Sequence, residues 1–539
     1  MRKESLTHIE LFAGCGGMSL GLEAAGLDLY FANELSPMAS ETFCYNLLNE
    51  NLQKLAANEG VGKKALWVKS NFPKDLLKNR LRENPFAFEK GKYSDLNDST
   101  DLKGKLLVGD INQLLSFFEN NKSIAKKIKR AEIDLLSGGP PCQSFSLAGR
   151  REKENQKNLL PLSFARFAGL VNPKIVLLEN VKGITSPFTI DDKKYYAWFE
   201  VAKAFCLEGF VPICMMVNSK YFGIPQNRPR FILIAIRKDI CKKLVIGVTE
   251  TASLNILLSS LDFFNHVCKN RNSLELVNKN KLVLYDIEKM PQLFNGLILP
   301  PIVTKKSEFI TAQEAIDDLM VSGNNEEEEK KPSNYVLHIN RVFKCNNESK
   351  MNGLKNQDLR RHGFNVRARF RWFQIMSNLN GLAPLALKLL SGQEVDEEKK
   401  NLIFERIKNE KVLMCDSEGE QMVKIKDREF FETYIKRIQT RKHSQRAIKA
   451  KEPVPAQMTI PDDLCHYSPL ELRTLTVREM ARFQSFPDCF EFRSKITTGG
   501  DQRSFEVPQY TQVGNAVPPL LAYYLGNHIK YLLKLVENA

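Results

Sequence analysis

The stretch IELFAGCGGMSLGLEAAG, residues Ile9–Gly26, joins an apolar run to a glycine-rich turn and then to an amphipathic helical pattern. Gly14, Gly16 and Gly17 remove side chains where the backbone must turn sharply, and they let it approach a ligand closely. The stretch therefore predicts a strand, a tight turn and a helix, with a candidate ligand site at the turn.

The alternation of apolar runs and helical patterns continues to about residue 240. It predicts a mostly parallel β-sheet with helices on both faces, in which ligands bind beyond the carboxyl ends of the strands. We expect strands at His8–Phe12, Leu29–Asn33, Lys105–Val108, Ile133–Ser137, Ile175–Leu178, Val211–Asn218 and Phe231–Ile236. We expect helices at Met18–Ala25, Ala39–Leu48, Leu162–Leu170, Trp198–Glu208, Thr476–Phe486 and Leu520–Val536.

Length and composition are those of a globular protein. A chain of 539 residues can hold two or three domains, and 43% hydrophobic with 26% charged residues is ordinary for a soluble protein. No run approaches the roughly 18 apolar residues of a membrane span, and the N-terminal MRKESLTHIELF lacks a signal-peptide cleavage site. The 11 cysteines include no CxxC pair, so we expect reduced thiols, a cytoplasmic location and no metal.

The net charge of +15, from 78 Lys and Arg against 63 Asp and Glu, favours a polyanionic partner. Many basic proteins bind no nucleic acid, so charge alone leaves both interpretations equally open. The residues at the predicted strand ends are needed to distinguish a nucleic-acid-binding protein from another basic protein.

The glycine turn suggests an adenosyl cofactor. After Gly14, the third glycine of a dinucleotide fingerprint would fall at Ser19, so a pyrophosphate cradle is less favoured. Glu34, twenty residues past Gly14, stands where a carboxylate can accept both ribose hydroxyls. Asp110 could accept from the adenine amino group, with Ile111 packed on the ring. The alternative is a plain tight turn with acids that cap helices.

A second group of residues has the composition of a catalytic site. Cys142 follows Gly-Gly-Pro-Pro directly after a predicted strand, which would expose its thiol at the carboxyl edge. Glu179 and Asn180 end another strand, and Arg228 and Arg230 follow in GIPQNRPRF. A cysteine is more often a buried, inert hydrophobe, but these neighbours favour a nucleophile.

These blocks resemble, in order, the motif set of the cytosine-5 DNA methyltransferase family, of the prokaryotic restriction-modification type. The matching blocks are FAGCGG, GDI, GGPPCQSFS, ENVKG, QNRPR, LTVREMARFQSFPD and QVGNAVPP. The resemblance implies an α/β fold: a Rossmann-like S-adenosylmethionine-dependent methyltransferase domain with a second, smaller target-recognition domain. It covers the catalytic half and the C-terminal end, but not the middle of the chain.

The resemblance also implies the cofactor, S-adenosylmethionine, which leaves as S-adenosylhomocysteine, and the residues that bind it. The last helix would return to the first domain and bring its preceding turn to the cofactor. The implied cofactor-binding residues are Phe12, Ala13, Gly14, Gly16, Gly17, Glu34, Asp110, Ile111, Pro140, Asn515 and Val517.

The chemistry of this family explains the residue types at the second group. The Cys142 thiolate would add to carbon 6 of cytosine and make carbon 5 nucleophilic. Glu179, as a protonated carboxyl with Asn180 beside it, would serve ring nitrogen 3, and Arg230 would hold the carbonyl oxygen with Arg228 as support. The cytosine must leave the helical stack to reach them. No residue is assigned as the base that removes the carbon-5 proton.

We expect residues 1–240 together with 508–539 to form the catalytic domain, with a probable insertion at 49–103. Residues 241–507 would form the target-recognition domain and hinge. The basic segments Arg360–Trp372 and Lys436–Lys451 could contact phosphates or bases there.

The expected partner is double-stranded DNA, bound by a monomer without a membrane, with a restriction endonuclease as functional partner and the prokaryotic cytosol and nucleoid as location. Two alternatives stay open. One is a transfer RNA methyltransferase that shares the pocket, although a large basic second domain favours duplex DNA. The other is a DNA-binding protein that has lost turnover, which would have no need for Cys142, Glu179 and Arg230 together.

Overall fold

The computed structural model describes residues 5–141, 156–190, 193–321, 330–344, 353–417, 419–442, 445–456, 459 and 462–538. Within these ranges, the largest feature is a nine-stranded sheet with strand order β12-β9-β11-β6-β5-β1-β2-β4-β3. The strands are β1 (Leu6–Leu11), β2 (Leu27–Glu34), β3 (Ala65–Trp67), β4 (Lys105–Val108), β5 (Leu135–Gly138), β6 (Ile175–Val181), β9 (Phe210–Asn218), β11 (Pro229–Arg237) and β12 (Leu284–Asp286).

The sheet is parallel except at β11, which runs antiparallel between β6 and β9. Its central strands are buried on both faces, which is why IVLLENV and PRFILIAIR are nearly continuous apolar runs. Because β11 is reversed, its first residues lie beside the carboxyl end of β6, and Arg230 pairs with Val181.

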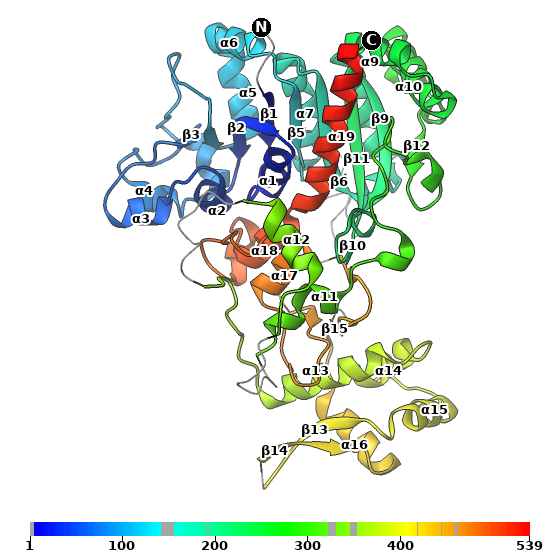
Figure 1. Ribbon diagram of the computed structural model, residues 1–539. Coiled ribbons are helices and arrows are strands. Elements are labelled where there is room, and N and C mark those ends of the chain that lie inside the picture. The colour runs from blue at the N-terminus through cyan, green and yellow to red at the C-terminus, as the bar shows by residue number, and fades with distance from the viewer. Residues whose placement is uncertain are drawn as a thin grey trace.

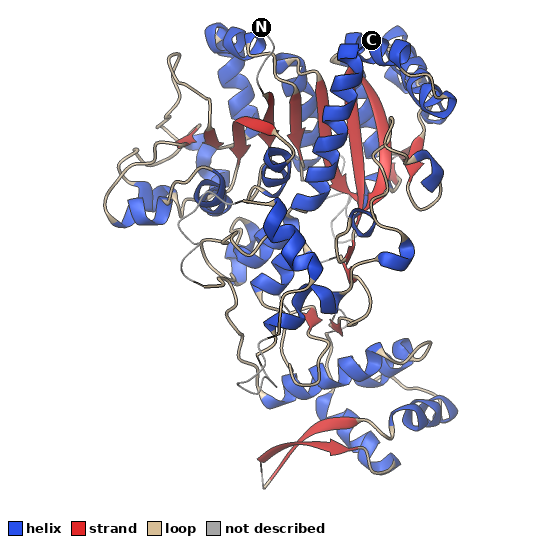
Figure 2. Cartoon of the chain, viewed as in Figure 1, coloured by secondary structure: helices blue, strands red, loops and turns tan. Residues whose placement is uncertain are grey.

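Helices cover both faces of the sheet (Figures 1 and 2). In the view of Figure 1, α1 (Gly17–Ala24) and the long C-terminal α19 (Pro519–Asn538) lie in front, and α7 (Gln156–Val171) lies behind. A Cβ built on Gly21 would come within 2.3 Å of the Pro519 carbonyl oxygen, so only glycine permits α1 to approach α19 this closely. The C-terminal helix is thereby fixed against the glycine-rich stretch.

A second hydrophobic cluster, separate from the main core, is built from residues 364–465. It lies at the bottom of Figure 1 and contains α13 (Phe364–Ser377), α14 (Ala383–Leu390), α15 (Glu397–Ile407), α16 (Arg428–Ile438) and the hairpin of β13 (Lys411–Asp416) and β14 (Gly419–Lys424). Between this cluster and the sheet lie α11 (Ala312–Ile316), α12 (Asn334–Val342), α17 (Val477–Phe483) and α18 (Gln509–Asn515). We call residues 364–438, which carry these helices and the hairpin, the lower module.

The predicted α/β class is confirmed, and each predicted strand overlaps an observed one. The edge strands β3 and β12, three residues each, were not expected, because three residues are too few to show a periodicity. The proposed domain boundaries stay a prediction. No helix in the described part of the chain is both long and apolar enough to cross a bilayer.

Candidate active site

The glycine-rich turn after β1 adopts the left-handed conformation that its residues allow. Gly14 has φ 56° and Gly16 has φ 97°, and Phe12, which is not a glycine, also has φ 56°. Ala13 is buried, and its N–H donates to the Asn33 carbonyl at 3.0 Å. The turn is thus pinned to the end of β2, where Glu34 stands.

Gly17, the first residue of α1, lies very close to the C-terminal turn. A Cβ there would lie 2.3 Å from the Val517 carbonyl oxygen. Val517 is half-buried and packs on the main core, whereas Asn515 at the end of α18 is exposed. The C-terminal turn therefore lies beside the glycine turn, which is the arrangement that the family resemblance implies.

Glu34 is held by backbone donors. Its Oε2 accepts the Gly14 N–H at 2.8 Å, and its Oε1 accepts the Ser36 N–H at 2.8 Å. Burial raises the pKa of Glu34, and these backbone hydrogen bonds oppose the shift. Each carboxylate oxygen still has a lone pair available, so the group can accept further hydrogen bonds.

Asp110 caps the next helix, α5 (Ile111–Asn120), as the alternative interpretation of this residue proposed. Its Oδ1 accepts the Asn112 N–H at 2.8 Å, while Oδ2 has no hydrogen-bond partner among the described residues. Capping and ligand binding are thus compatible in one side chain. The Ile111 side chain is 2% exposed and belongs to the core.

Two partly exposed apolar side chains belong to the segments that carry the glycine turn and Glu34. Phe12 and Leu35 are partly exposed and pack on the main core, and the Phe12 ring meets Phe164 edge-on at 6.3 Å. Leu35 was missed in the sequence, although its place directly after Glu34 could have indicated it. Carboxylate oxygens that can still accept hydrogen bonds, apolar neighbours and a glycine-rich turn are the kinds of group that an adenosyl cofactor needs.

The turn that leads to Cys142 lies against the end of β6. The Asn180 amide donates to the Pro140 carbonyl at 2.9 Å, and a Cβ on Gly139 would lie 3.2 Å from Glu179 Oε2. Pro140 is buried. Cys142 lies outside the described residues, so its predicted place beside Glu179 is untested.

Glu179 and Arg230 form an ion pair at the carboxyl edge of the sheet. Arg230 Nε lies 2.7 Å from Glu179 Oε1, and the side chains are 9% and 10% exposed. Burial lowers the pKa of Arg230, and the neighbouring Glu179 carboxylate opposes the shift. The arginine belongs to the first residues of the reversed strand β11, so the amino end of that strand completes the edge.

Arg228 donates hydrogen bonds to the C-terminal turn. Its Nη2 donates to the Gly514 and Ala516 carbonyls at 2.9 and 3.1 Å, and the residue is 2% exposed. Burial lowers the pKa of Arg228, with the charge of Arg230 as the next cause, yet a guanidinium stays charged in proteins. This side chain positions the turn that carries Val517.

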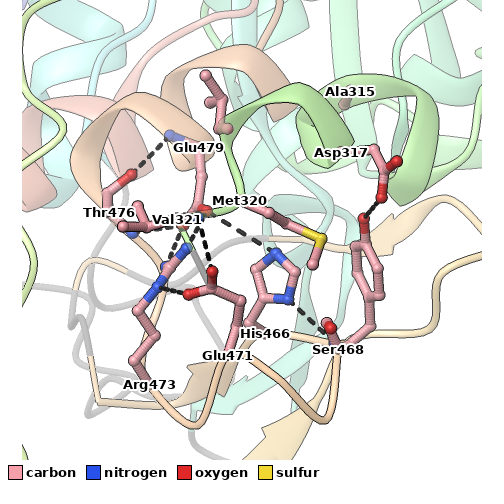
Figure 3. A network of polar contacts seen from close by, with 12 residues as sticks. Ala315, Asp317, Met320, Val321, His466, Ser468, Glu471, Arg473, Thr476 and Glu479 are labelled. Carbon is pink, nitrogen blue, oxygen red and sulfur yellow. Dashed lines mark hydrogen bonds and ion pairs between the residues drawn. The ribbon is translucent and has the colours of Figure 1, made fainter. Parts of the chain in front are cut away.

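Below the site, a buried polar network joins α17 to residues 466–473, which follow the lower module in the sequence (Figure 3). Arg473 donates to both carboxylate oxygens of Glu479 at 2.8 Å and also pairs with Glu471 at 2.5 Å. Gln374 of α13 donates to the carbonyls of His466 and Ser468 at 2.9 and 2.7 Å. We call Arg473, Glu479, Glu471, His466 and Gln374 the joint network.

Among the described residues, no group of three or more His, Cys, Asp or Glu side chains is arranged to hold a metal ion. The sequence profile of the C-5 cytosine-specific DNA methylase family matches residues 6–66 and 108–531. Residues 67–107 thus fall between its two matched stretches.

Individual relatives are similar over very different lengths. Type II methyltransferase M.DdeI of Desulfomicrobium norvegicum is 24% identical over 532 residues, which is 97% of this chain and 88% of the relative. Orphan methyltransferase M.SPRI of Bacillus phage SPR is 34% identical over 163 residues, 30% of this chain and 35% of the relative. The crystal structure of S. pombe Dnmt2 methyltransferase aligns with a TM-score of 0.39 and 14% identity, covering 98% of this chain and 99% of that one.

Proposed function

Since the chain belongs to the C-5 cytosine-specific DNA methylase family and is a DNA (cytosine-5) methyltransferase, we propose that it acts on a cytosine rotated out of duplex DNA through a covalent bond from Cys142. The sulfur would add to carbon 6, and the thiol would be eliminated after carbon 5 loses its proton. Rotation of the base is needed because a stacked cytosine shields both ring faces.

The Glu179–Arg230 pair supports this proposal. In the bound state, Glu179 would hold a proton or hydrogen bond at ring nitrogen 3, and Arg230 would donate to the carbonyl oxygen, where negative charge develops. Asn180 would keep the Gly139–Pro140 turn, and with it Cys142, beside this pair, because its amide holds the Pro140 carbonyl.

S-adenosylmethionine, when bound, supplies an electrophilic methyl group. On this chain, Glu34 would accept from the ribose hydroxyls and Asp110 Oδ2 from the adenine amino group. The main chain of Gly14, Gly16 and Gly17 would let the cofactor come close. The implied residues Phe12, Ala13, Ile111, Pro140, Asn515 and Val517 would form or support the surrounding wall.

We further propose that residues 241–507 form the target-recognition domain and hinge, with residues 1–240 and 508–539 as the catalytic domain. The lower module carries α13, a helix with Arg367 and Arg369 on its first turns, and a projecting hairpin. Elements of this kind can enter a major groove. Type II methyltransferases among the relatives support a restriction-modification role. We propose an endonuclease as functional partner and a monomer as the acting form.

The observation that carries the proposal is the buried Glu179–Arg230 pair placed against the turn that precedes Cys142. We expect Cys142→Ser to bind duplex DNA but to lose transfer of tritiated methyl groups, since a hydroxyl is a far weaker nucleophile at neutral pH. Cys415→Ser is the matched control, because Cys415 is an exposed thiol in β13. Retained turnover in Cys142→Ser would overturn the assignment.

A duplex containing 5-fluorocytosine tests the covalent step. Fluorine cannot leave as a proton, so the adduct should persist on a denaturing gel with the wild-type chain and with Cys415→Ser, but not with Cys142→Ser. Methylation of transfer RNA in place of duplex DNA in the tritium assay would instead support the RNA alternative.

A further inference from the structure

Residues 67–107, which separate the two stretches that match the family, form an ordered lobe at the edge of the sheet. Arg80 pairs with Asp95 at 2.7 Å, and the two side chains are 1% and 5% exposed. Glu83 accepts from the Ser70 hydroxyl at 2.6 Å. A buried ion pair and buried hydrogen bonds give this segment, the edge lobe, a defined shape.

The first contact of the edge lobe is with the GDI motif. Hydrogen bonds link the ends of three neighbouring strands, β2, β4 and β3. The Gly109 N–H after β4 donates to the Glu34 carbonyl of β2 at 2.9 Å, and the Val68 N–H after β3 donates to the Val108 carbonyl of β4 at 2.8 Å. Neighbouring strands lie about 4.8 Å apart, so Val68 is on the order of 10 Å from Glu34.

Val68 also occupies the space that a side chain at Gly109 would need. A Cβ built on Gly109 would come within 2.7 Å of the Val68 Cβ, and Val68 is 4% exposed. Gly109 directly precedes Asp110. Packing of Val68 on this glycine therefore restrains the backbone that presents the Asp110 carboxylate.

The second contact of the edge lobe is with α2 (Pro37–Leu47). Arg82 forms an ion pair with Glu41 of this helix, whose other oxygen accepts from Gln53 at 2.7 Å. Ser36 caps α2, and its N–H donates to Glu34 Oε1. Leu81 and Arg82 line a small hollow together with Ser36, so the lobe abuts the segment that holds the Glu34 carboxylate.

We propose that the edge lobe sets the affinity of this chain for the adenosyl half of the methyl donor. Val68 and Arg82 are positioning residues: Val68 restrains Asp110 through Gly109, and Arg82 restrains Glu34 through α2. This assignment rests on the proposed donor site. It gives a role in cofactor binding to a segment that the family match leaves out.

Calorimetric titration with S-adenosylhomocysteine tests the assignment without turnover. We expect Val68→Ala and Arg82→Ala each to raise the Kd about threefold to tenfold. Their matched controls are Val61→Ala, at a valine 38% exposed, and Lys78→Ala, at an exposed cation of the same lobe, and both should leave the Kd unchanged. Arg82→Lys, which keeps the charge opposite Glu41, should recover most of the affinity.

Kinetics distinguish this positioning role from a role limited to folding. On our assignment, the KM for S-adenosylmethionine rises while kcat and the affinity for duplex DNA stay within about twofold of wild type. Loss of all three together would overturn it in favour of a general structural role. Arg82 is 41% exposed, so its variants should fold even where Val68→Ala does not.

Glu34→Ala distinguishes a failure of the edge-lobe assignment from a failure of the proposed donor site. Weaker binding in Glu34→Ala, with wild-type Kd in Val68→Ala and Arg82→Ala, would overturn the lobe assignment and leave the donor site standing. Wild-type Kd in Glu34→Ala would overturn the donor site itself.

Discussion

Arg230 and Glu179 are diagonal neighbours on one face of the sheet, with Arg230 Nε 2.7 Å from Glu179 Oε1. Arg230 pairs with Val181 across the antiparallel strands β11 and β6, and Glu179 lies two residues before Val181. Residues two apart on a strand share a face, as do cross-strand partners, so the pair follows from the register. A one-residue slip of β11 would turn Arg230 to the opposite face.

We expect Arg230→Ala to lower kcat about a hundredfold or more, because it removes a donor aimed at developing negative charge. The Kd for S-adenosylhomocysteine should stay within about twofold of wild type, since the polar partners of Arg230, Glu179 and the Pro229 carbonyl, are not among the proposed donor-site residues. Arg237→Ala is the control, because Arg237 ends the same strand and pairs with Asp239 at the surface. Single-turnover transfer would measure the effect, and an equal loss in both variants would contradict the role.

The sequence was enough to predict this edge in part. Glu179 and Asn180 follow a long apolar run, so their place at a carboxyl end could be inferred. The arginines could not be placed in the same way, because periodicity does not reveal strand direction, and Arg230 lies at the beginning of the reversed β11. Arg228 was expected to support the base, yet its hydrogen bonds run to Gly514 and Ala516, nearly 290 positions away in the chain.

Tertiary contacts explain the remaining differences. The insertion at Asn49–Lys103 was inferred from spacing alone and stays a prediction. Spacing could not reveal that Val68 packs on Gly109 or that Arg82 pairs with Glu41, because these pairs are distant in the sequence. The lower module has its own hydrophobic cluster, which no family motif covers. Short motifs with a chemical reason for each residue type are therefore readable in a single sequence, whereas the contacts between them are not.

Arg228→Ala should destabilise the fold and weaken cofactor binding together. The substitution leaves the Gly514 and Ala516 carbonyls without their donor in a buried place, which costs about 2–4 kcal/mol. Because these carbonyls flank the turn of Val517, the Kd for S-adenosylhomocysteine should rise as well. Thermal unfolding and calorimetry would measure both effects, and an unchanged melting temperature would contradict the positioning role.

Glu10 should make stability depend on pH on the alkaline side. Burial raises the pKa of Glu10 to about 8 from an ordinary 4.5, against the opposing hydrogen bond from Ser19. Between these values the folded chain keeps a proton that the unfolded chain has lost. Stability from this group therefore falls as pH rises from about 4.5 to about 8, by at most about 1.4 kcal/mol per pH unit.

Glu10→Gln, which resembles the protonated acid, should remove this slope and raise the melting temperature at pH 8 more than at pH 6. Glu429→Gln, at an exposed position of α16, is the control and should leave the profile unchanged. If the melting temperatures of wild type and Glu10→Gln change with pH in the same way between about pH 4.5 and 8, Glu10 does not titrate as described.

The joint network should couple the lower module to the catalytic half without reaching the cofactor. Burial alone would raise the pKa of Glu479, but the hydrogen bonds and charge of Arg473 hold it below its ordinary value, so the pair is charged and buried. Glu479→Gln removes one charge of that pair and should cost about 3–5 kcal/mol. The same substitution at Glu432, which pairs with Arg428 on the surface of α16, should cost less than about 1 kcal/mol.

Because Gln374 joins α13 to the backbone of His466, loss of the network should also loosen the lower module against α17. We therefore expect Glu479→Gln to bind duplex DNA more weakly while its Kd for S-adenosylhomocysteine stays unchanged. Both affinities are measured below the melting temperature of this variant. The Glu34 and Gly14 contacts lie on separate elements and should not respond. If both affinities fell together, the network would be a general support of the fold; if neither fell, the lower module would be held by other contacts.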